Sequence, residues 1–429
     1  MLTQDGARHG VRNPGKGPQK QPQPRRGDRT SLKGTGFSPY INQPPPNHLT
    51  HKMAVLGGFV GSEIKLALGN LEVDWGKNET FHDHLPLFQK GDLREPTGPE
   101  LPTSDTAGVH QNGKTLIKRL RDVLPRLRLL GYTLASAADE YETLRDQFEA
   151  GGTISFEELV KAAKRVDVSA VPRGYYNDYA FGRFFDEEIT PRLKLKKYLP
   201  RVAEQRDYGE MMENFHPWSA LCLLAQRPEN LEQLVVWDFS ETVEGGWETE
   251  ESFVPALPPS NRFLVVTEGS SDAKILRKAL DLLRPSICDF FYFVDMQEGY
   301  PFSGTGNLAN FCKGLISIGI LNKTLIVFDN DAEGVLKVKE ISELNRPSNL
   351  SVMLLPELSE LKSVETIGPS GRSHEDINGR AASIEAYLDL KWESDSDPVV
   401  RWSNYLEKVG RYQGALVSKA QYARRFLDL

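Results

Sequence analysis

The sequence lacks several features that would assign it to a membrane or to an oxidising compartment. No run approaches about 18 consecutive apolar residues, so no membrane-spanning helix is predicted. The first residues have no apolar core of the kind that a secretory signal needs. Three cysteines, Cys222, Cys288 and Cys312, lie far apart and form no CxxC pair. We expect reduced thiols rather than disulfides or a zinc site, which favours a cytoplasmic protein.

The chain also lacks the overall positive charge of a protein that binds nucleic acid with its whole surface. Its formal net charge is −7 at pH 7, although residues 1–52 contain nine Lys or Arg and two Asp or Glu. Those residues therefore carry +7, and the rest of the chain carries −14. Such an acidic body does not attract a phosphate backbone by bulk charge. Any contact with nucleic acid would need local basic patches or bound metal ions.

The composition divides the N-terminal part of the chain into two segments. Residues 1–52 are rich in Pro, Gly, Gln, Lys and Arg and show almost no aliphatic periodicity. This composition predicts a disordered basic leader. We expect residues 53–105 to form a small β-rich element. Within it, residues 62–78 alternate like two strands around Gly69 and Asn70, which are typical residues of a hairpin turn.

Helical periodicity dominates residues 106–250, where we expect a helical domain. Residues 114–130 place their apolar side chains on one helical face. These side chains are Leu116, Leu120, Val123, Leu127 and Leu130. Ser155 and Glu158 have the spacing of a capping box, which predicts the start of another helix. The acidic, glycine-containing run 240–260 is interpreted as a linker.

Strand-like and helix-like patterns alternate after this linker. The runs expected to be buried strands are 262–269, 289–296, 324–328 and 351–356. The alternation predicts a parallel sheet flanked by helices over residues 261–392. We expect residues 393–429 to form a C-terminal helical segment. The predicted fold class is an α/β C-terminal domain joined to a mainly helical N-terminal domain that carries a small β-hairpin element.

Acidic residues follow two of the predicted strands. Glu268 stands at the end of one strand, Asp329 and Asp331 follow 324–328, and Asp272 lies in the first turn of the helix after Glu268. In an open parallel sheet, the loops at the carboxyl ends of the strands form the functional crevice. If the strands are neighbours, the four carboxylates converge and repel one another unless a divalent cation holds them. Oxygen ligands favour Mg²⁺ or Mn²⁺, either of which could support attack of water on a phosphoryl group.

Local explanations compete with a metal site for the single residues. Asp272 alone fits a helix N-cap equally well. One acid at the end of a strand is most often a solvated turn residue. The combined pattern of E-G-x-x-D before a helix and D-x-D after an aliphatic strand is more specific than any of its parts.

A calcium-binding loop is another alternative for the segment after residue 328. The EF-hand formula is fulfilled at its positions 1, 3, 5, 6 and 12 by Asp329, Asp331, Glu333, Gly334 and Glu340. An EF-hand needs a helix before the loop, however, and the preceding run "TLIVF" is typical of a strand. The flanking sequence therefore disfavours calcium.

Two of these segments resemble motifs of a known fold. "VVTEGSSDAKIL" (265–276) and "LIVFDNDAEG" (325–334) resemble the two motifs of the Toprim fold, which topoisomerases, primases and OLD-type nucleases share. A topoisomerase would also need a strand-passage domain with a nucleophilic tyrosine, for which the chain offers no room. The resemblance therefore implies a Toprim-like α/β domain of the nuclease kind.

The resemblance is closer still to the bacterial HEPN/Toprim-associated proteins. Their N-terminal domain resembles "GSEIKLALGNLEVDWGKN", and their middle resembles "LVVWDFSETVEGGW" (234–247). The segment "INGRAASIEAYL" (377–388) also resembles the region that follows the D-x-D motif in them. In total the resemblance covers about residues 57–425 and implies a HEPN-like helical domain over 106–250.

The resemblance implies a role for each acid. Glu268 would be the Toprim glutamate, acting as a metal ligand or as a general acid or base. Asp329 and Asp331 would be the metal-binding pair, and Asp272 a further ligand. OLD-type sites include a later acid, for which Glu385 is the best match; its alternative reading is an acid on a helix surface.

Two further elements of a nuclease site are expected. OLD-type nucleases use a late lysine to stabilise developing phosphate charge, and Lys419 is the candidate here, with a solvated helix residue as the alternative. The loop "FSGTGN" could present the backbone N–H groups of Gly304 and Gly306 to a phosphate at the start of the next helix. A flexible turn explains the same glycines equally well.

The expected activity is therefore metal-dependent cleavage of nucleic acid, DNA or RNA, with Mg²⁺ or Mn²⁺ as cofactor. The family resemblance implies bacterial defence against phage, with a defence-system protein or a second copy as partner and no membrane. The alternative is a non-catalytic scaffold or sensor that binds metal or nucleic acid. The R-x4–6-H motif of HEPN ribonucleases is missing, since Arg206 and His216 stand too far apart. We expect His216 to be a helix-start or core residue, and the helical domain to be structural.

Overall fold

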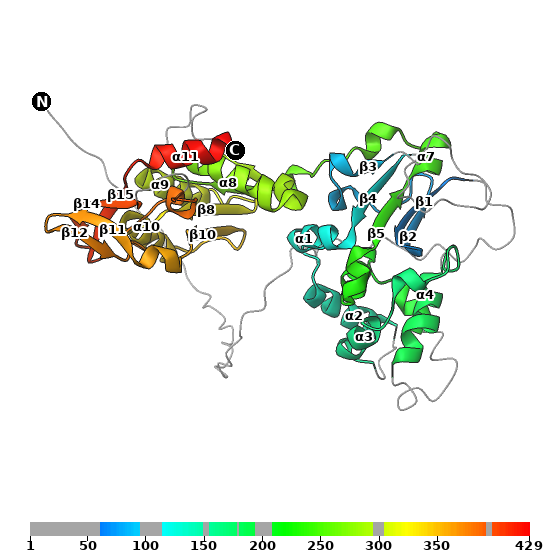
Figure 1. The fold of residues 1–429 in the computed structure, drawn as a ribbon. Coiled ribbons are helices and arrows are strands. Elements are labelled where there is room, and N and C mark those ends of the chain that lie inside the picture. Colours follow the sequence, from blue (N-terminus) through cyan, green and yellow to red (C-terminus); the bar gives the residue numbers. More distant parts are fainter. Residues whose placement is uncertain are drawn as a thin grey trace, which may run out of the picture. The chain divides into compact units, whose positions relative to one another are not determined.

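The computed structural model describes residues 61–94, 114–148, 154–177, 180–193, 208–294, 304–391 and 397–429. By internal contacts the chain forms two units, residues 1–46 and residues 47–429, and all of the described residues belong to the second. The predicted basic leader, residues 1–52, lies outside the described residues. Figure 1 shows the elements of the second unit in chain order.

A five-stranded antiparallel sheet forms the centre of the N-terminal domain, in the order β2-β1-β5-β4-β3. Its strands are β1 (Glu63–Leu68), β2 (Leu71–Lys77), β3 (Leu93–Arg94), β4 (Thr115–Arg119) and β5 (Leu234–Asp238). The predicted hairpin is confirmed, because Leu68 pairs with Leu71 across a turn in which Gly69 has a φ of 56°. A side chain at Gly69 would be strained in this left-handed conformation.

The sheet corrects two predictions about this region. The expected helix over 114–130 begins at Leu120, because residues 115–119 form β4 instead. Strand β5 pairs with β1 on one side and with β4 on the other, so segments 53–105 and 106–250 contribute to one sheet rather than to separate domains. The local pattern of "TLIKR" suits either structure, and its pairing with a strand more than a hundred residues away decides between them.

Helices cover this sheet and complete the N-terminal core. They are α1 (Leu120–Leu130), α2 (Leu134–Gln147), α3 (Phe156–Ala163), α4 (Phe181–Phe184), α6 (Pro217–Leu224) and α7 (Ser240–Glu244). The capping box is confirmed, since the side chain of Ser155 accepts from Glu158 N and the side chain of Glu158 accepts from Ser155 N. The run 240–260 is not a free linker, because Phe253 and Leu257 are buried in the core. No helix among the described residues is both long and apolar enough to cross a membrane.

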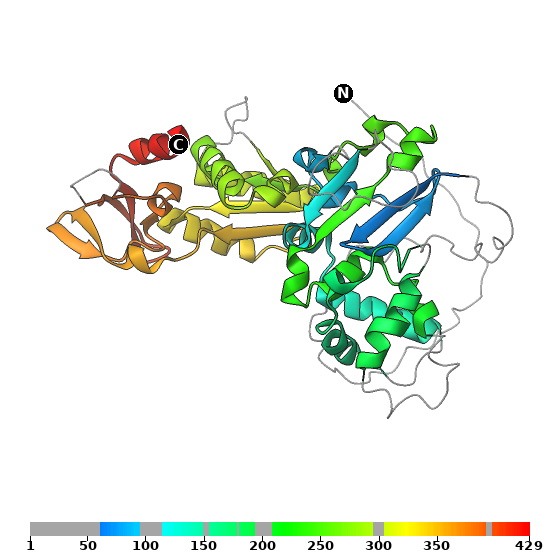
Figure 2. The same ribbon diagram turned by 45° about the vertical axis from the view of Figure 1, so that its right-hand side comes forward.

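A four-stranded parallel sheet follows, in the order β10-β8-β6-β7. Its strands are β6 (Phe263–Val266), β7 (Phe291–Phe293), β8 (Thr324–Phe328) and β10 (Leu350–Leu354). Buried residues of α9 (Thr305–Ser317) and α10 (Ala332–Ser342) pack on one face. Those of α8 (Ser270–Leu283) and α11 (Lys419–Asp428) pack on the other (Figure 2). The expected parallel sheet flanked by helices is thus present.

A second β-structure lies beyond this sheet and corrects the expected C-terminal helical segment. Strands β11 (Val364–Gly368), β12 (Gly371–Glu375), β14 (Val399–Leu406) and β15 (Arg411–Leu416) form a sheet in the order β12-β11-β14-β15. Residues 393–429 therefore contain a β-hairpin before α11. Valine and aromatic residues favour strands here, and Gly410 turns the chain with a φ of 64°. The short strands β9 (Asn330–Asp331) and β13 (Ala381–Ala382) pair with each other.

Candidate active site at the ends of the parallel strands

Two neighbouring strands bring Glu268 and Asp329 together. Strands β6 and β8 pair in parallel, with Val266 opposite Ile326. Glu268 lies two residues beyond β6, and Asp329 directly follows β8. The main-chain N–H of Asp329 donates a hydrogen bond to Glu268 Oε1 at 3.0 Å. The two acids that are far apart in the sequence therefore meet at one edge of the sheet.

Hydrogen bonds hold Glu268 from two further directions. Thr305 Oγ1, at the start of α9, donates to Glu268 Oε2 at 2.6 Å. The Gly304 N–H donates to the carbonyl oxygen of Glu268 at 3.0 Å. The side chain is buried, and burial raises the pKa of Glu268 to about 7, against the lowering effect of the bonds from Thr305 and Asp329. Its carboxyl group can therefore gain or lose a proton near neutral pH.

Asp272 is not the N-cap of α8, which is Gly269, but it bonds back to that residue from the first turn of the helix and also belongs to the acid cluster. Its Oδ2 accepts a hydrogen bond from the Gly269 N–H at 3.0 Å, which closes the first turn of α8. Burial raises the pKa of Asp272, and the negative charge of Glu385 raises it further. Asp272 thus stabilises the start of α8 and also lies close enough to Glu385 for its charge to matter.

Asp329 and Asp331 point their carboxylates in different directions. Asp329 Oδ1 accepts from the Ile384 N–H at 3.1 Å. Asp331 Oδ1 caps α10 by accepting from Gly334 N at 2.7 Å, and its Oδ2 accepts from Gln413 Nε2 at 2.6 Å. Burial raises the pKa of both aspartates. The pKa of Asp329 rises further through the negative charges of Asp272, Glu268, Asp331 and Glu385.

Glu385 lies within reach of these acids. It belongs to the short helix η12 (Ile384–Tyr387) and is 3% exposed, so the alternative of a surface acid is wrong. Its Oε2 accepts from Ser383 Oγ at 2.7 Å. Its charge acts on both Asp272 and Asp329. The cluster therefore draws its acids from three separate stretches of the chain.

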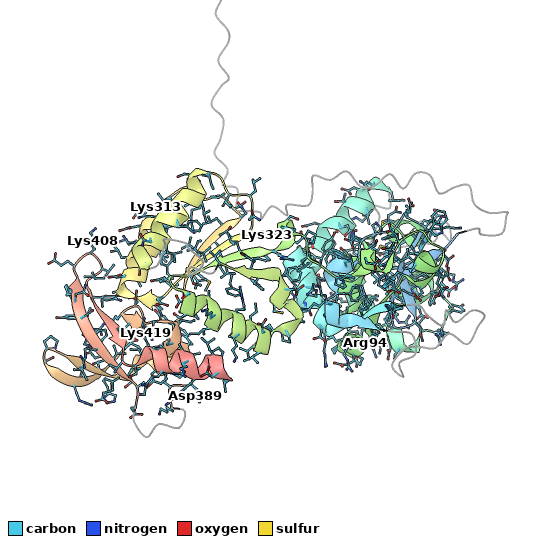
Figure 3. All side chains as sticks on the ribbon, turned by 90° about the horizontal axis from the view of Figure 1, so that it is seen from above. Arg94, Lys313, Lys323, Asp389, Lys408 and Lys419 are labelled. Carbon is cyan, nitrogen blue, oxygen red and sulfur yellow. The ribbon has the colours of Figure 1, made fainter. Side chains whose placement is uncertain are left out.

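Lys419 and the two loop glycines differ in how close they come to the acids. Lys419 is the exposed first residue of α11 (Figure 3), and its positive charge acts on Asp272. Gly304 is the N-cap of α9, and its N–H is already used by Glu268. Gly306 is an exposed residue in the first turn of the same helix. The charge of the lysine thus acts on one acid of the cluster, whereas one of the two expected phosphate-binding N–H groups has another partner.

The structure excludes an EF-hand after residue 328. Strand β8 occupies the place where an EF-hand needs a helix. Glu340, the residue at the twelfth position, forms an ion pair with Lys337 at 3.0 Å within α10. The D-x-D pattern therefore belongs to a strand end and not to a calcium loop.

The chemistry of the cluster suits a hard divalent cation. Buried carboxylates with raised pKa values repel one another, and a cation would relieve this repulsion. Nevertheless, within the described ranges no three His, Cys, Asp or Glu side chains are arranged to hold a metal ion as they stand. Several of the oxygen atoms accept hydrogen bonds from the protein instead. The donor set thus fits a metal ion chemically, and its side chains would have to turn toward one.

Two site residues were missed by reasoning from the sequence. Thr305 contacts Glu268 and stands in the glycine-rich loop, of which only Gly304 and Gly306 were predicted to bind phosphate. Gln413 contacts Asp331 from β15, 82 residues further along the chain. A hydroxyl in a Gly-rich loop beside the strands was a usable signal for Thr305. No local pattern indicates Gln413, since pairing of distant segments brings it there.

His216 occupies the position expected of a helix-start residue. It is the N-cap of α6, and its Nδ1 accepts from the Trp218 N–H at 3.1 Å. Burial lowers the pKa of His216 to about 3, and the neighbouring rings of His82 and His84 lower it further. The histidine is therefore neutral at physiological pH. Arg206, which stands too far from His216 in the sequence for the HEPN motif, lies outside the described residues.

The fold and this cluster define a protein with a sheet-and-helix N-terminal domain followed by an α/β unit whose strand ends carry acids. Residues 60–261 match the family model of HEPN/Toprim N-terminal domain 1. These residues of the chain therefore belong to the HEPN/Toprim N-terminal domain 1 family. Neither a curated protein nor a solved structure matches the chain. The match covers the N-terminal domain and ends just before β6, so the acid cluster lies beyond it.

Proposed function

We propose that this protein is a metal-dependent nuclease of the Toprim type that hydrolyses phosphodiester bonds in DNA or RNA. The observation that carries the proposal is the meeting of Glu268 and Asp329 at the ends of two parallel strands. The charges of Asp272, Asp331 and Glu385 converge on the same place. The name of the matching family agrees with a nuclease-like activity.

The residues that would hold Mg²⁺ or Mn²⁺ are Glu268, Asp272, Asp329, Asp331 and Glu385. Such an ion, when bound, polarises a phosphoryl oxygen and readies a water molecule for attack. Carboxylate oxygens are the ligands that both ions prefer. Because the acids come from three stretches of chain, the ion would also fasten η12 to the strand ends.

Two side chains of the protein have roles of their own in this proposal. Glu268, held by Thr305 and by the Asp329 N–H, would accept or return a proton at the reacting oxygen. Lys419 would stabilise the negative charge that develops on the phosphate, since it stands at the start of α11 beside Asp272. Gly306 and the start of α9 offer a place for a neighbouring phosphate.

The arrangement of the acids supports one alternative function, that of a non-catalytic protein. Since no three acidic or other ligand side chains in the described segments are arranged around a common metal position, the cluster could serve a non-catalytic scaffold or sensor. Such a protein would bind metal or nucleic acid without cutting it. Activity measurements separate the two functions.

A cleavage assay with the full chain tests the proposal. Single- and double-stranded DNA and RNA are incubated with the protein and Mg²⁺ or Mn²⁺, and the products are resolved on denaturing gels. We expect cleavage of at least one substrate, and its loss in Glu268→Gln and Asp329→Asn. The matched control is Glu333→Gln, an exposed acid two residues from Asp331, which should cut normally. A protein that is inert on all four substrates, yet binds them, would favour the scaffold.

We also propose a cellular setting, supported by the family resemblance. The nuclease would act in the bacterial cytoplasm against phage or foreign DNA, together with a defence-system protein or as a homo-oligomer. Phage plating on cells that express the wild type or Asp329→Asn tests the role in defence. Equal plating on both strains, with equal amounts of protein, would contradict it. Light scattering of the purified chain tests self-association.

A further inference from the structure

Strand β15 turns two polar side chains toward the candidate active site. Side chains alternate along a strand, so Arg411 and Gln413 share one face, and Tyr412 between them lies on the other. Arg411 Nη1 donates to the Gly379 carbonyl oxygen at 3.3 Å. Gln413 Nε2 donates to Asp331 Oδ2 at 2.6 Å. The face of β15 that carries Gln413 therefore lies against the acid cluster.

The side-chain amide of Gln413 is fixed at both of its polar atoms. While its Nε2 is bound to Asp331, its Oε1 accepts from the Glu333 N–H at 3.1 Å, in the first turn of α10. The next residue, Gly414, holds β15 in this place, because its N–H donates to the Arg380 carbonyl oxygen at 3.1 Å. The amide is thus a bridge from β15 to the turn that follows β8.

Asp331 is held from two sides and still has acceptor sites left. The Gly334 N–H donates to its Oδ1 at 2.7 Å, and Gln413 donates to its Oδ2. An ionised carboxylate has about four lone-pair sites, so Asp331 can bind a cation without giving up either hydrogen bond. The negative charge of Asp331 acts on both Glu268 and Asp329. The orientation imposed by the two bonds therefore keeps Asp331 close to the other acids.

We propose that Gln413 is a positioning residue of the metal site, which holds the Asp331 carboxylate in the orientation that binds a divalent cation. Hydrogen bonds from surrounding residues orient the carboxylates that ligate metals, and their loss typically weakens metal binding by about 10–100-fold. Gln413 acts through Asp331 and touches no reacting atom. The inference rests on the proposed nuclease function for the metal site, and it makes the β14–β15 hairpin a part of that site.

The opposite role is the competing explanation. The amide N–H could occupy the place that a cation needs, so that Gln413 would block Asp331 from the metal. The two roles predict changes of opposite sign, because removal of the amide weakens metal binding in the first case and strengthens it in the second. A bridge that is only structural gives a third result, in which thermal stability falls and the affinity for metal stays the same.

The test measures binding of Mn²⁺ to the full-length chain without nucleic acid, from the electron paramagnetic resonance signal of free Mn²⁺. The variant is Gln413→Met, which has a similar length and loses the N–H donor. We expect the dissociation constant of the ion that Asp329→Asn fails to bind to rise about tenfold or more. In cleavage assays, the Mn²⁺ concentration that gives half of the maximal rate should rise by the same factor, and excess Mn²⁺ should restore the rate.

Control variants separate positioning from stability. Tyr412→Ala removes the neighbouring side chain on the opposite face of β15, whose ring centroid lies 5.0 Å from that of Tyr405. It should lower the thermal midpoint and leave the affinity for Mn²⁺ unchanged. Gln421→Met makes the same exchange at an exposed position of α11 and should change neither. If Gln413→Met has no thermal transition in EDTA, Gln413→Asn replaces it; its amide is one CH₂ shorter, and several-fold weaker binding is expected.

Three results would overturn the proposal. They are a wild type without an Mn²⁺ site that depends on Asp329, a folded Gln413 variant that binds Mn²⁺ as tightly as the wild type or more tightly, and an equal loss of affinity in Tyr412→Ala. Failure of the proposed nuclease looks different. Mn²⁺-dependent cleavage with unchanged affinity in Gln413→Met would remove the positioning role and leave the nuclease standing. Binding of Mn²⁺ that depends on Gln413, with no cleavage of any nucleic acid, would support the positioning role and remove the nuclease.

Discussion

The main-chain N–H of Asp329 donates to Glu268 Oε1 at 3.0 Å, although 61 residues separate the two acids. The bond ties the end of β8 to the end of β6. It therefore keeps the buried carboxylate of Glu268 near the half-buried carboxylate of Asp329, in a place where their charges repel. Because the donor is a backbone group, a change in the Asp329 side chain should leave this contact in place.

Asp329→Asn should remove cleavage and at the same time stabilise the protein. The pKa of Asp329 is raised well above its usual value by burial and by four neighbouring acids. A raised carboxyl pKa means that stability is lost as the pH rises, since ionisation of the folded state is disfavoured. Asparagine cannot ionise and keeps the oxygen that accepts from Ile384. Without metal at pH 8, we expect a gain of order 1 kcal/mol, or about 2–4 °C in thermal midpoint; a lower midpoint would contradict this account.

A divalent cation should stabilise the wild type and not Asp329→Asn. A ligand that binds only the folded state raises its stability by about 2.7 kcal/mol at a hundredfold excess over the dissociation constant. Thermal melts of both proteins with increasing Mg²⁺ or Mn²⁺ measure this effect without any assay of activity. The control is Glu333→Gln, which should respond like the wild type. An equal shift in all three proteins would place the bound ion elsewhere.

Thr305→Val should move the pH dependence of cleavage to higher pH. The hydroxyl of Thr305 donates to Glu268 Oε2 and lowers the pKa of that group, which is about 7 in the intact site. Without this bond, the pKa should rise by up to about one unit, the equivalent of a hydrogen bond worth roughly 1.4 kcal/mol. The acid limb of kcat/KM against pH would then shift upward. Thr305→Ser keeps the hydroxyl and should keep the wild-type profile.

His216→Asn should make the stability of the protein less sensitive to acid. Burial lowers the pKa of His216 to about 3, from an ordinary value of 6.5. Between these values the unfolded chain binds a proton that the folded protein does not, so stability falls as the pH falls. The loss is about 1.4 kcal/mol per pH unit over this window. Asparagine is a good N-cap without a proton to bind, so the difference in thermal midpoint between pH 7 and pH 5 should shrink. An unchanged difference would contradict the buried neutral histidine.

Gly334→Ala should disrupt the turn between β8 and α10. A Cβ atom at this position would overlap the carbonyl oxygen of Asp329, which is backbone and cannot move aside cheaply. We expect a loss of about 2 kcal/mol or more in stability, together with loss of cleavage. Gly314→Ala is the matched control, because nothing lies within 4 Å of its added Cβ in α9. That change should be neutral or stabilising by up to about 1 kcal/mol.

The sequence allowed the parallel sheet and its acids to be predicted because each depends on short patterns. The run 324–328 is bounded as predicted, and the helix expected after Glu268 forms as α8. A continuous aliphatic run indicates a buried strand, and an amphipathic period indicates a helix that packs on a sheet. Both are local patterns, and burial in the folded protein favours the same structures. Because Glu268 and Asp329 follow the carboxyl ends of two parallel strands, pairing of those strands as neighbours brings the two acids together.

Features that depend on distant pairing escaped prediction. Residues 115–119 continue a helical pattern, yet the ladder with β5 makes them a strand. The hairpin in 399–416 lies inside the segment 393–429 that was predicted to be helical, and its strands become stable by pairing with β11 and with each other. Gln413 likewise reaches Asp331 through this tertiary arrangement. Local propensity is too weak to decide such cases.

Backbone groups provide many of the contacts that fix the acid cluster. The N–H groups of residues 269, 329, 334 and 384 each donate to one of its carboxylates. Every amino acid except proline supplies that donor. The residue types at 329 and 384 could therefore change while the hydrogen bonds from their N–H groups to the neighbouring carboxylates remain. Related sites would then be hard to recognise by comparing residues one by one. The path of the main chain around the acids is the feature by which to search for them.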